Sequence, residues 1–255
     1  MNNNINIFFS SLSNFIIKTL RGFFRCLHES KIIAAFFYGF ISFIVYIFLL
    51  VQISGDSDYN FILENKRIND ATKLNSIYVN KIINPTTLKE ISTAITNSTG
   101  PISIGGAKYS MGGQTAFENS LHIDMRSYKK IINLNTSKKE VTVQPGLTWR
   151  ELQNVIDPHN LSVKIMQTYA NFSIGGSISV NAHGRYVGHG PIISSVISMK
   201  VVLSSGEIIE VSRIKNQDIF NAVVGGYGGI GVIVEVTLQL VDNVKVERQV
   251  NTIKI

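Results

Sequence analysis

The stretch that decides the fold is "GGAKYSMGGQT", residues 105–115, which carries four glycines in eleven residues. It follows the apolar segment "PISI" at 101–104 and precedes "LHIDM" at 121–125. Both segments are typical of short buried strands, so the loop is expected to join strand to strand. Because glycine lacks a Cβ atom, such a loop lets a ligand approach the backbone closely. The simpler alternative is a pair of tight turns that bind nothing.

Two more glycine-rich stretches follow, "SIGGSISVNAHG" at 173–184 and "GGYGGIG" at 225–231. The second contains the spacing G-x-G-x-x-G in Gly226, Gly228 and Gly231. A Rossmann fingerprint needs a strand before this motif and a helix after it, whereas the order here is reversed. A P-loop is excluded too, because no glycine is followed by Lys and then Ser or Thr. The remaining interpretation is a nest of backbone N–H groups that binds an anion.

From about residue 76 the sequence alternates short strands and turns with a few helices, which predicts an α+β fold. Helices are expected at 84–100, at 149–157 after the capping pair Thr148 and Glu151, and at 218–224. Strands are expected at 76–83, 101–106 and 121–125, in hairpins at 131–146 and 196–212, and finally at 231–241.

The N-terminal part differs in composition from the rest. Residues 32–53 are 22 residues without a formal charge, and as a helix they would span roughly 33 Å, enough for a hydrocarbon core of about 30 Å. We therefore predict an amphipathic interfacial segment at 1–30, a transmembrane helix at 31–54 and a linker at 55–75, which makes the membrane a partner. Positive charges before the span predict a single-pass protein with a cytoplasmic N-terminus and an extracytoplasmic body, although Lys66, Arg67 and Lys73 weaken this orientation.

Charge and cysteine content exclude several classes. The formal net charge is +7, spread without a basic run, which argues against a nucleic-acid partner. Cys26 is the single cysteine, so an intrachain disulfide or a cysteine-based metal site cannot form. No metal is expected.

The glycine loops, taken in order with the segments between them, resemble the FAD-binding domain of the vanillyl-alcohol oxidase and p-cresol methylhydroxylase (PCMH-type) flavoprotein family. The match runs over about residues 76–245, from "PISIGGAKYSMGGQT" to "DIFNAVVGGYGGIGVIVEVTLQL". The resemblance implies two α+β subdomains, FAD as the cofactor and a small-molecule substrate. It also implies an oxidoreductase that moves a hydride from a hydroxyl-bearing carbon of a sugar, lactone or alcohol to the flavin.

The resemblance also implies roles for individual residues. Asn181 and His183 would lie near the isoalloxazine, and His183 is the candidate active-site residue, with His189 as the alternative; a catalytic base is not assigned. Gly228 and Ile233 would contact the adenosine half. Trp149 is interpreted as helix packing rather than as a cofactor stack. The pyrophosphate would be held by Gly105, Gly106, Ala107, Lys108, Tyr109, Ser110, Met111, Gly112, Gln114 and Thr115. The flavin side would be held by Thr168, Ser173, Gly175 and Gly176.

Two departures from the family pattern matter. Several members bond the flavin covalently through a histidine where this sequence has Tyr109. A phenol is far less basic than an imidazole at neutral pH, so we predict non-covalent FAD. Family enzymes also continue into a cap domain, whereas residues 246–255 would be only its start or a tail. We therefore expect that the chain is a fragment, that the gene is truncated, or that a partner chain supplies the cap. The alternative functions are a truncated, non-catalytic FAD-binding module and an FAD-dependent reductase that uses NAD(P)H.

Overall fold

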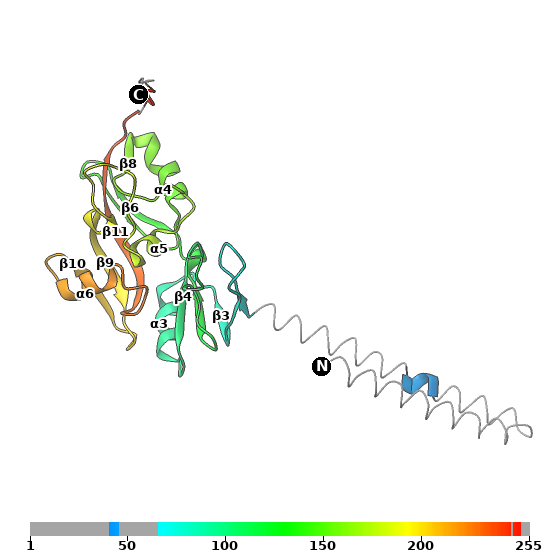
Figure 1. Ribbon diagram of the computed structural model, residues 1–255. Coiled ribbons are helices and arrows are strands. Elements are labelled where there is room, and N and C mark those ends of the chain that lie inside the picture. The colour runs from blue at the N-terminus through cyan, green and yellow to red at the C-terminus, as the bar shows by residue number, and fades with distance from the viewer. Residues whose placement is uncertain (1–40, 46–65, 246, 251–255) are drawn as a thin grey trace, which may run out of the picture. The chain divides into compact units, whose positions relative to one another are not determined.

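The computed structural model describes residues 41–45, 66–245 and 247–250 (Figure 1). The chain divides into two compact units, Met1–Ile62 and Leu63–Ile255. In the first unit the described part is a helix at 41–45 whose side chains are exposed. The second unit holds every other element described below, and it combines helices and strands as the α+β prediction requires.

The predicted single-pass membrane location is corrected by the structure. Within 41–45, 66–245 and 247–250, no helix has both the length and the apolar character needed to cross a bilayer. The predicted interfacial segment 1–30 and the rest of the span 31–54 lie outside the described residues.

A small parallel sheet begins the second unit. Its strands β3 (Lys81–Ile83), β5 (Leu121–Asp124) and β4 (Ile102–Gly105) are paired in that order. The crossover from β3 to β4 is α3 (Leu88–Thr96), and a capping box of Thr87 and Glu90 starts this helix. The connection from β4 to β5 carries the first glycine loop instead of a helix. This loop therefore leaves the carboxyl end of a parallel strand, where open α/β sheets bind their ligands.

The predicted linker 55–75 is shorter than expected at its C-terminal end. Residues 66–75 belong to the folded body, because β1 (Arg67–Ile68) pairs with β2 (Ile77–Tyr78). The Ala71 N–H also donates to the Lys108 carbonyl at 2.8 Å. The predicted strand 76–83 is divided into β2 and β3.

A larger antiparallel sheet forms the rest of the unit. Its order is β10 (Ile208–Ser212), β9 (Val196–Val202), β11 (Val232–Asp242), β7 (Glu140–Val143) and β6 (Ile131–Asn135), with β8 (Leu161–Val163) also paired to β11. Both predicted hairpins and the long final strand are confirmed. Along the central strand β11, buried and partly exposed side chains alternate, and Val236, Leu238 and Leu240 are buried.

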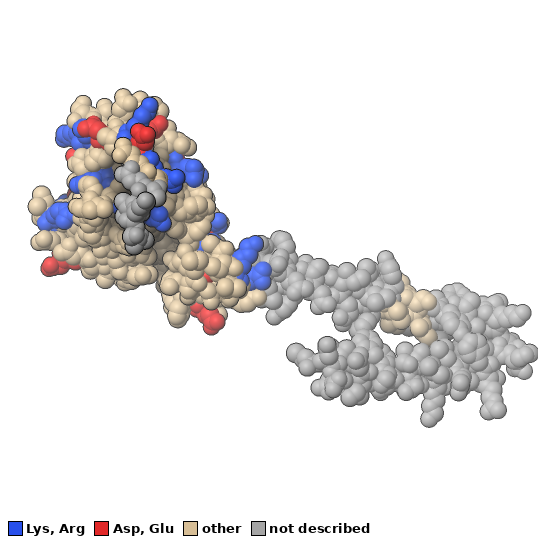
Figure 2. All heavy atoms as spheres, turned by 45° about the horizontal axis from the view of Figure 1, so that its top comes forward, with Lys and Arg blue, Asp and Glu red and all other residues tan. Residues whose placement is uncertain are grey.

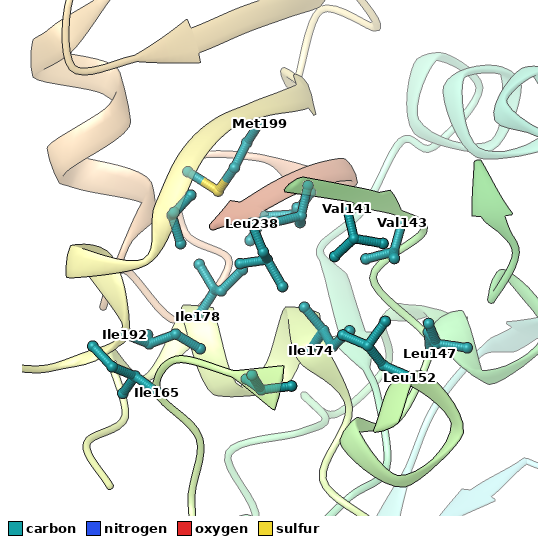
Figure 3. Packing of buried hydrophobic residues seen from close by; sticks show 14 of the residues in the cluster. Val141, Val143, Leu147, Leu152, Ile165, Ile174, Ile178, Ile192, Met199 and Leu238 are labelled. Atoms are coloured by element: carbon teal, nitrogen blue, oxygen red, sulfur yellow. The ribbon is translucent and has the colours of Figure 1, made fainter. Parts of the chain in front are cut away.

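Three helices accompany this sheet: α4 (Trp149–Ile156), α5 (Ile174–Ser179) and α6 (Gln217–Val223). Figure 3 shows Ile174 and Ile178 of α5 packed with Leu152 of α4 beside the sheet residue Leu238, in one continuous apolar core. Short 3-10 turns complete the unit at Met125–Ser127, Asp157–His159 and Ile192–Ser194. Charge is scattered over the described surface: on the face in Figure 2, basic and acidic side chains are interspersed among uncharged ones.

Candidate functional site

The three glycine-rich stretches converge on one cavity of about 250 Å³. Its wall comes from the loop after β4, from the start of α5 and from the turn between α6 and β11. Among the residues predicted to bind the cofactor, those on the wall are Gly106, Ala107, Lys108, Tyr109, Ser110, Gln114, Thr115, Ser173, Gly175, Gly176, Gly228 and Ile233. Segments up to 127 residues apart in sequence, Gly106 to Ile233, are thus brought together as the motif order predicts.

Close backbone approach within the wall explains the need for glycine at two positions. A Cβ atom on Gly106 would overlap the Ser173 hydroxyl, which accepts a hydrogen bond from the Ala107 N–H at 3.2 Å. A Cβ on Gly175 would lie 2.6 Å from the Pro145 Cβ. The first loop is therefore tied directly to the start of α5, and neither contact tolerates a side chain.

The first loop presents a row of free donors. Backbone N–H groups of Lys108, Tyr109 and Ser110 have no hydrogen-bond partner among the described residues. Lys108 has a φ of +62°, in the left-handed region that lysine rarely adopts. Successive N–H groups in such a turn form a concave nest for an anion.

A buried ion network lies behind this loop. Asp124, at the end of β5, is almost completely buried and accepts from Lys108 Nζ at 2.8 Å and from Arg126 Nη2 at 2.6 Å. Burial alone would raise the pKa of Asp124, but the hydrogen bonds from Arg126 and Lys108 outweigh it and hold the pKa at about 2. Two cations share one carboxylate, so the network keeps one net positive charge beside the cavity.

His122 lies in β5 beneath Gly105 and is fully buried. The Ser120 hydroxyl donates to the Phe117 carbonyl at 2.6 Å, so Ser103 must donate to Ser120 and His122 Nδ1–H must donate to Ser103. This chain leaves His122 Nε2 as a bare acceptor without a partner among the described residues. Desolvation, followed by the nearby Lys108 charge, lowers the pKa of His122 to about 4.

Tyr109, the residue at the position of the covalent histidine in some family members, is part of an aromatic cluster. Its ring meets Phe172 edge-on with centroids 5.0 Å apart and Tyr169 with centroids 5.2 Å apart. A hydrogen bond to Tyr169 raises the pKa of Tyr109. The cluster fixes Tyr109 against the segment that leads into α5.

The remaining predicted residues lie off the cavity wall. Gly105 packs on His122, and its missing Cβ would lie 2.7 Å from Nε2. The Gly112 N–H donates to Gln114 Oε1 at 2.9 Å, while Met111 and Thr168 are exposed. Asn181 has a φ of +45° and accepts from the Ile193 N–H. His183 is exposed and donates from Nδ1 to the Gly184 carbonyl at 3.0 Å, so its catalytic role stays a prediction.

Sequence reasoning missed two notable wall residues. Tyr227 has a φ of +51° and a ring that is 64% exposed, although it lies on the cavity wall. An aromatic residue between two pairs of glycines, in "GGYGG", was the available signal. Gln167 also lies on the wall, and no local motif marks it.

Comparison with known proteins agrees with this geometry. The profile of a family described as "FAD binding domain" matches residues 79–212, more than half of the chain. The chain belongs to this FAD-binding family. The predicted resemblance to PCMH-type FAD-binding domains is thereby confirmed, and so is FAD as the cofactor.

Several relatives of this FAD-binding domain carry the names of lactone dehydrogenases or lactone oxidases. It is 38% identical over 120 residues to "L-galactono-1,4-lactone dehydrogenase 2, mitochondrial" of Oryza sativa subsp. japonica, which covers 47% of this chain and 21% of the relative. It is 30% identical over 119 residues to "L-gulonolactone oxidase" of Bos taurus, covering 47% and 27%. A third match, 25% over 163 residues, is "Uncharacterized oxidoreductase ORF5 in fasciation locus" of Rhodococcoides fascians, covering 62% and 37%. The matches therefore span well under half of each relative.

Proposed function

We propose that the chain holds FAD without a covalent bond and serves an oxidoreductase that oxidises a hydroxyl-bearing carbon of a sugar lactone or a related sugar or alcohol. The observation that carries this proposal is the row of free N–H groups on the first loop, backed by the net positive network of Lys108, Asp124 and Arg126. Phosphate groups suit both features, because a nest supplies donors and the network supplies charge. The relatives' names supply the lactone class.

The proposed division of roles follows the cavity wall. Lys108, Tyr109 and Ser110 donate from the backbone to the pyrophosphate, and Ser173 keeps their loop in place through Ala107. Tyr227 offers an exposed aromatic face to a planar ring of the cofactor. When bound, FAD supplies the hydride-accepting chemistry, while the protein supplies orientation and electrostatics.

Non-covalent attachment is proposed from the chemistry of Tyr109. Its hydroxyl is hydrogen-bonded to Tyr169 and its ring contacts Tyr169 and Phe172 edge-on. Its raised pKa keeps the phenol neutral near pH 7, so it is a poor nucleophile there. We therefore expect that acid precipitation of the FAD-loaded chain leaves all of the flavin in the supernatant.

The cavity of about 250 Å³ is slightly smaller than the range of about 300–1,000 Å³ that is usual for sites enclosing a small molecule. We propose that residues 76–245 hold the cofactor and that the groups which select the substrate come from protein outside this segment, in the same chain or in a partner. Residues 246–255 are proposed to begin that additional protein.

The test is anaerobic reduction of the FAD-loaded chain. L-galactono-1,4-lactone, L-gulono-1,4-lactone and NADPH are mixed separately with the flavoprotein, and the visible flavin band is followed. Bleaching by a lactone but not by NADPH is the expected result. Bleaching by NADPH alone would instead identify a reductase, and flavin that no donor bleaches would identify a non-catalytic module.

A further inference from the structure

Gln167 reaches the cavity wall from the segment between β8 and α5. Its side chain is half-buried, and its carboxamide meets two other side chains. Ser177 Oγ donates to Gln167 Oε1 at 2.6 Å, and Trp149 Nε1 lies 3.3 Å from the same oxygen. One end of the amide is therefore fixed from the side of α4 and α5.

Trp149 indicates whether the oxygen or the NH₂ group of the Gln167 carboxamide faces α4 and α5. The indole is completely buried in α4, and Nε1–H can only donate. It donates to Ser177 Oγ at 2.9 Å, and the serine proton has two acceptors within reach, Gln167 Oε1 at 2.6 Å and the Ser173 carbonyl at 3.0 Å. A flipped carboxamide would put its NH₂ group 3.3 Å from the indole N–H, donor against donor. The observed arrangement places the oxygen toward Trp149 and Ser177, where it accepts from both, and turns the NH₂ group away from them.

The backbone around Gln167 is held by the same helix. The first N–H groups of α4, those of Trp149 and Arg150, donate to the carbonyls of Phe172 and Ala170 at 3.2 and 2.8 Å. These bonds hold the backbone that follows Gln167 against the start of α4. No described residue accepts a hydrogen bond from Gln167 Nε2. Gln167 lies on the cavity wall, so the structure leaves a donor of a wall residue without a partner among the described residues.

We infer that Gln167 is a cofactor-binding residue whose NH₂ group donates to an acceptor atom of FAD, and that Trp149 and Ser177 are positioning residues that orient this donor. The inference rests on the proposed FAD site. A donor that is already fixed loses little freedom on binding, so it contributes more to affinity than a mobile side chain would. FAD offers carbonyl, ring-nitrogen and phosphate acceptors, which match a neutral amide donor.

Gln167→Glu tests the donor with the smallest change of shape. The substitution keeps an oxygen toward Trp149 and Ser177 and replaces the unpaired NH₂ group with an acceptor. Trp149 is the single tryptophan of the sequence, so quenching of its emission during FAD titration reports binding directly. We expect affinity to fall about tenfold or more, as when a buried hydrogen bond is replaced by an unpaired acceptor.

The matched control is Gln217→Glu, which makes the same change of charge at an exposed position at the start of α6. Its affinity should stay within about twofold of the unaltered chain. Thermal unfolding of each FAD-free variant shows whether the fold is kept. If Gln167→Glu does not fold, Gln167→Met removes the amide without adding charge, and its affinity should also fall several-fold.

Ser177→Ala separates positioning from direct contact, because Ser177 also lies on the cavity wall. The substitution should weaken FAD binding several-fold in the unaltered chain and have little effect in the Gln167→Met background, since a positioning residue acts only through its partner. Equal losses in both backgrounds would overturn the positioning role. If the unaltered chain binds FAD and both Gln167→Glu and Gln167→Met bind it with the same affinity, the inference is overturned and the proposed function stands. If the unaltered chain binds no FAD, the proposed function itself is rejected.

Discussion

His122 and Asp124 are neighbouring residues of one short strand, yet burial affects their protonation in different ways. His122 is kept neutral because its imidazole is desolvated and Lys108 lies nearby, so its pKa is about 4. Asp124 is kept ionised because Lys108 and Arg126 compensate its burial, so its pKa is about 2. Both side chains support the first glycine loop, so acid should loosen the same region in two separate steps.

The first step gives a pH prediction. Between about pH 6.5 and pH 4 the unfolded chain protonates His122 and the folded chain does not, so the free energy of unfolding falls as pH decreases. The loss attributable to His122 is up to about 3 kcal/mol. His122→Asn keeps an N–H donor for Ser103 and removes this titration. Urea denaturation at a series of pH values should show a flatter dependence in this window for the variant.

The contribution of Asp124 lies at lower pH and is the internal control. It is present above about pH 4 and is lost as pH falls toward 2, so His122→Asn should leave that part unchanged. An identical pH dependence above pH 4 in the variant and the unaltered chain would show that His122 is not the titrating group.

Gly106 provides a prediction about the ligand. In Gly106→Ala the new Cβ would overlap the Ser173 hydroxyl that holds Ala107, so the loop must shift and its row of donors is disturbed. FAD affinity, measured by quenching of Trp149, should fall about tenfold or more, a loss of about 1.4 kcal/mol. Gly100→Ala is the matched control, because a Cβ there meets nothing within 4 Å. Equal affinity for both variants would exclude a tight loop at Gly106.

At the scale of elements, α4 organises the site although it provides little of its wall. Its capping box joins Thr148 and Glu151, and an isolated bridge pairs Thr148 with Ser173. The first turn of α4 thus holds the segment that carries Phe172 and Gln167 into the cavity. A weakened N-terminus of this helix should therefore affect both stability and the site.

Thr148→Ala tests this arrangement. Loss of the N-cap hydroxyl should lower the free energy of unfolding by about 1 kcal/mol, measured by urea denaturation at neutral pH. Thr148→Ser keeps the hydroxyl that accepts from the Glu151 N–H and should stay close to the unaltered chain. A Thr148→Ala variant as stable as the serine variant would show that the capping box does not support the helix.

Elements with a strong local signal were predictable from sequence. The capping pair Thr148 and Glu151 marked α4, and alternating apolar residues marked the hairpins and β11. The helix α5 was not, because two glycines in "IGGSIS" disfavour a helix. Packing overrides that preference: Gly175 fits against Pro145, and Ile174 and Ile178 are fully buried in the core.

The candidate site shows the same division. The glycines predicted to let the cofactor approach the backbone could be located because clustered glycines are visible in the sequence itself. Most of these glycines lie on the cavity wall. Gln167 could not be located, since its proposed role depends on contacts with Trp149 and Ser177, which lie 18 and 10 residues away in sequence. Tertiary hydrogen bonds of this kind leave no periodic pattern in a single sequence.

At the scale of the whole molecule, the described body joins a small parallel sheet to a larger antiparallel one, and the glycine loops of both contribute to one cavity. Membership of the FAD-binding family agrees with this arrangement. The central claim is that this cavity, without covalent attachment, binds a flavin dinucleotide through its phosphates. Flavins that differ in their phosphate content separate this claim from simple binding of the ring.

The most direct measurement is a titration of the purified 255-residue chain with FAD, FMN and riboflavin, followed by quenching of Trp149 emission and then by acid precipitation. We predict saturable one-to-one quenching by FAD, weaker binding of FMN, the weakest binding of riboflavin, and complete release of the flavin by acid. Riboflavin binding as tight as that of FAD, flavin that remains with the precipitated protein, or no quenching by FAD would contradict this prediction.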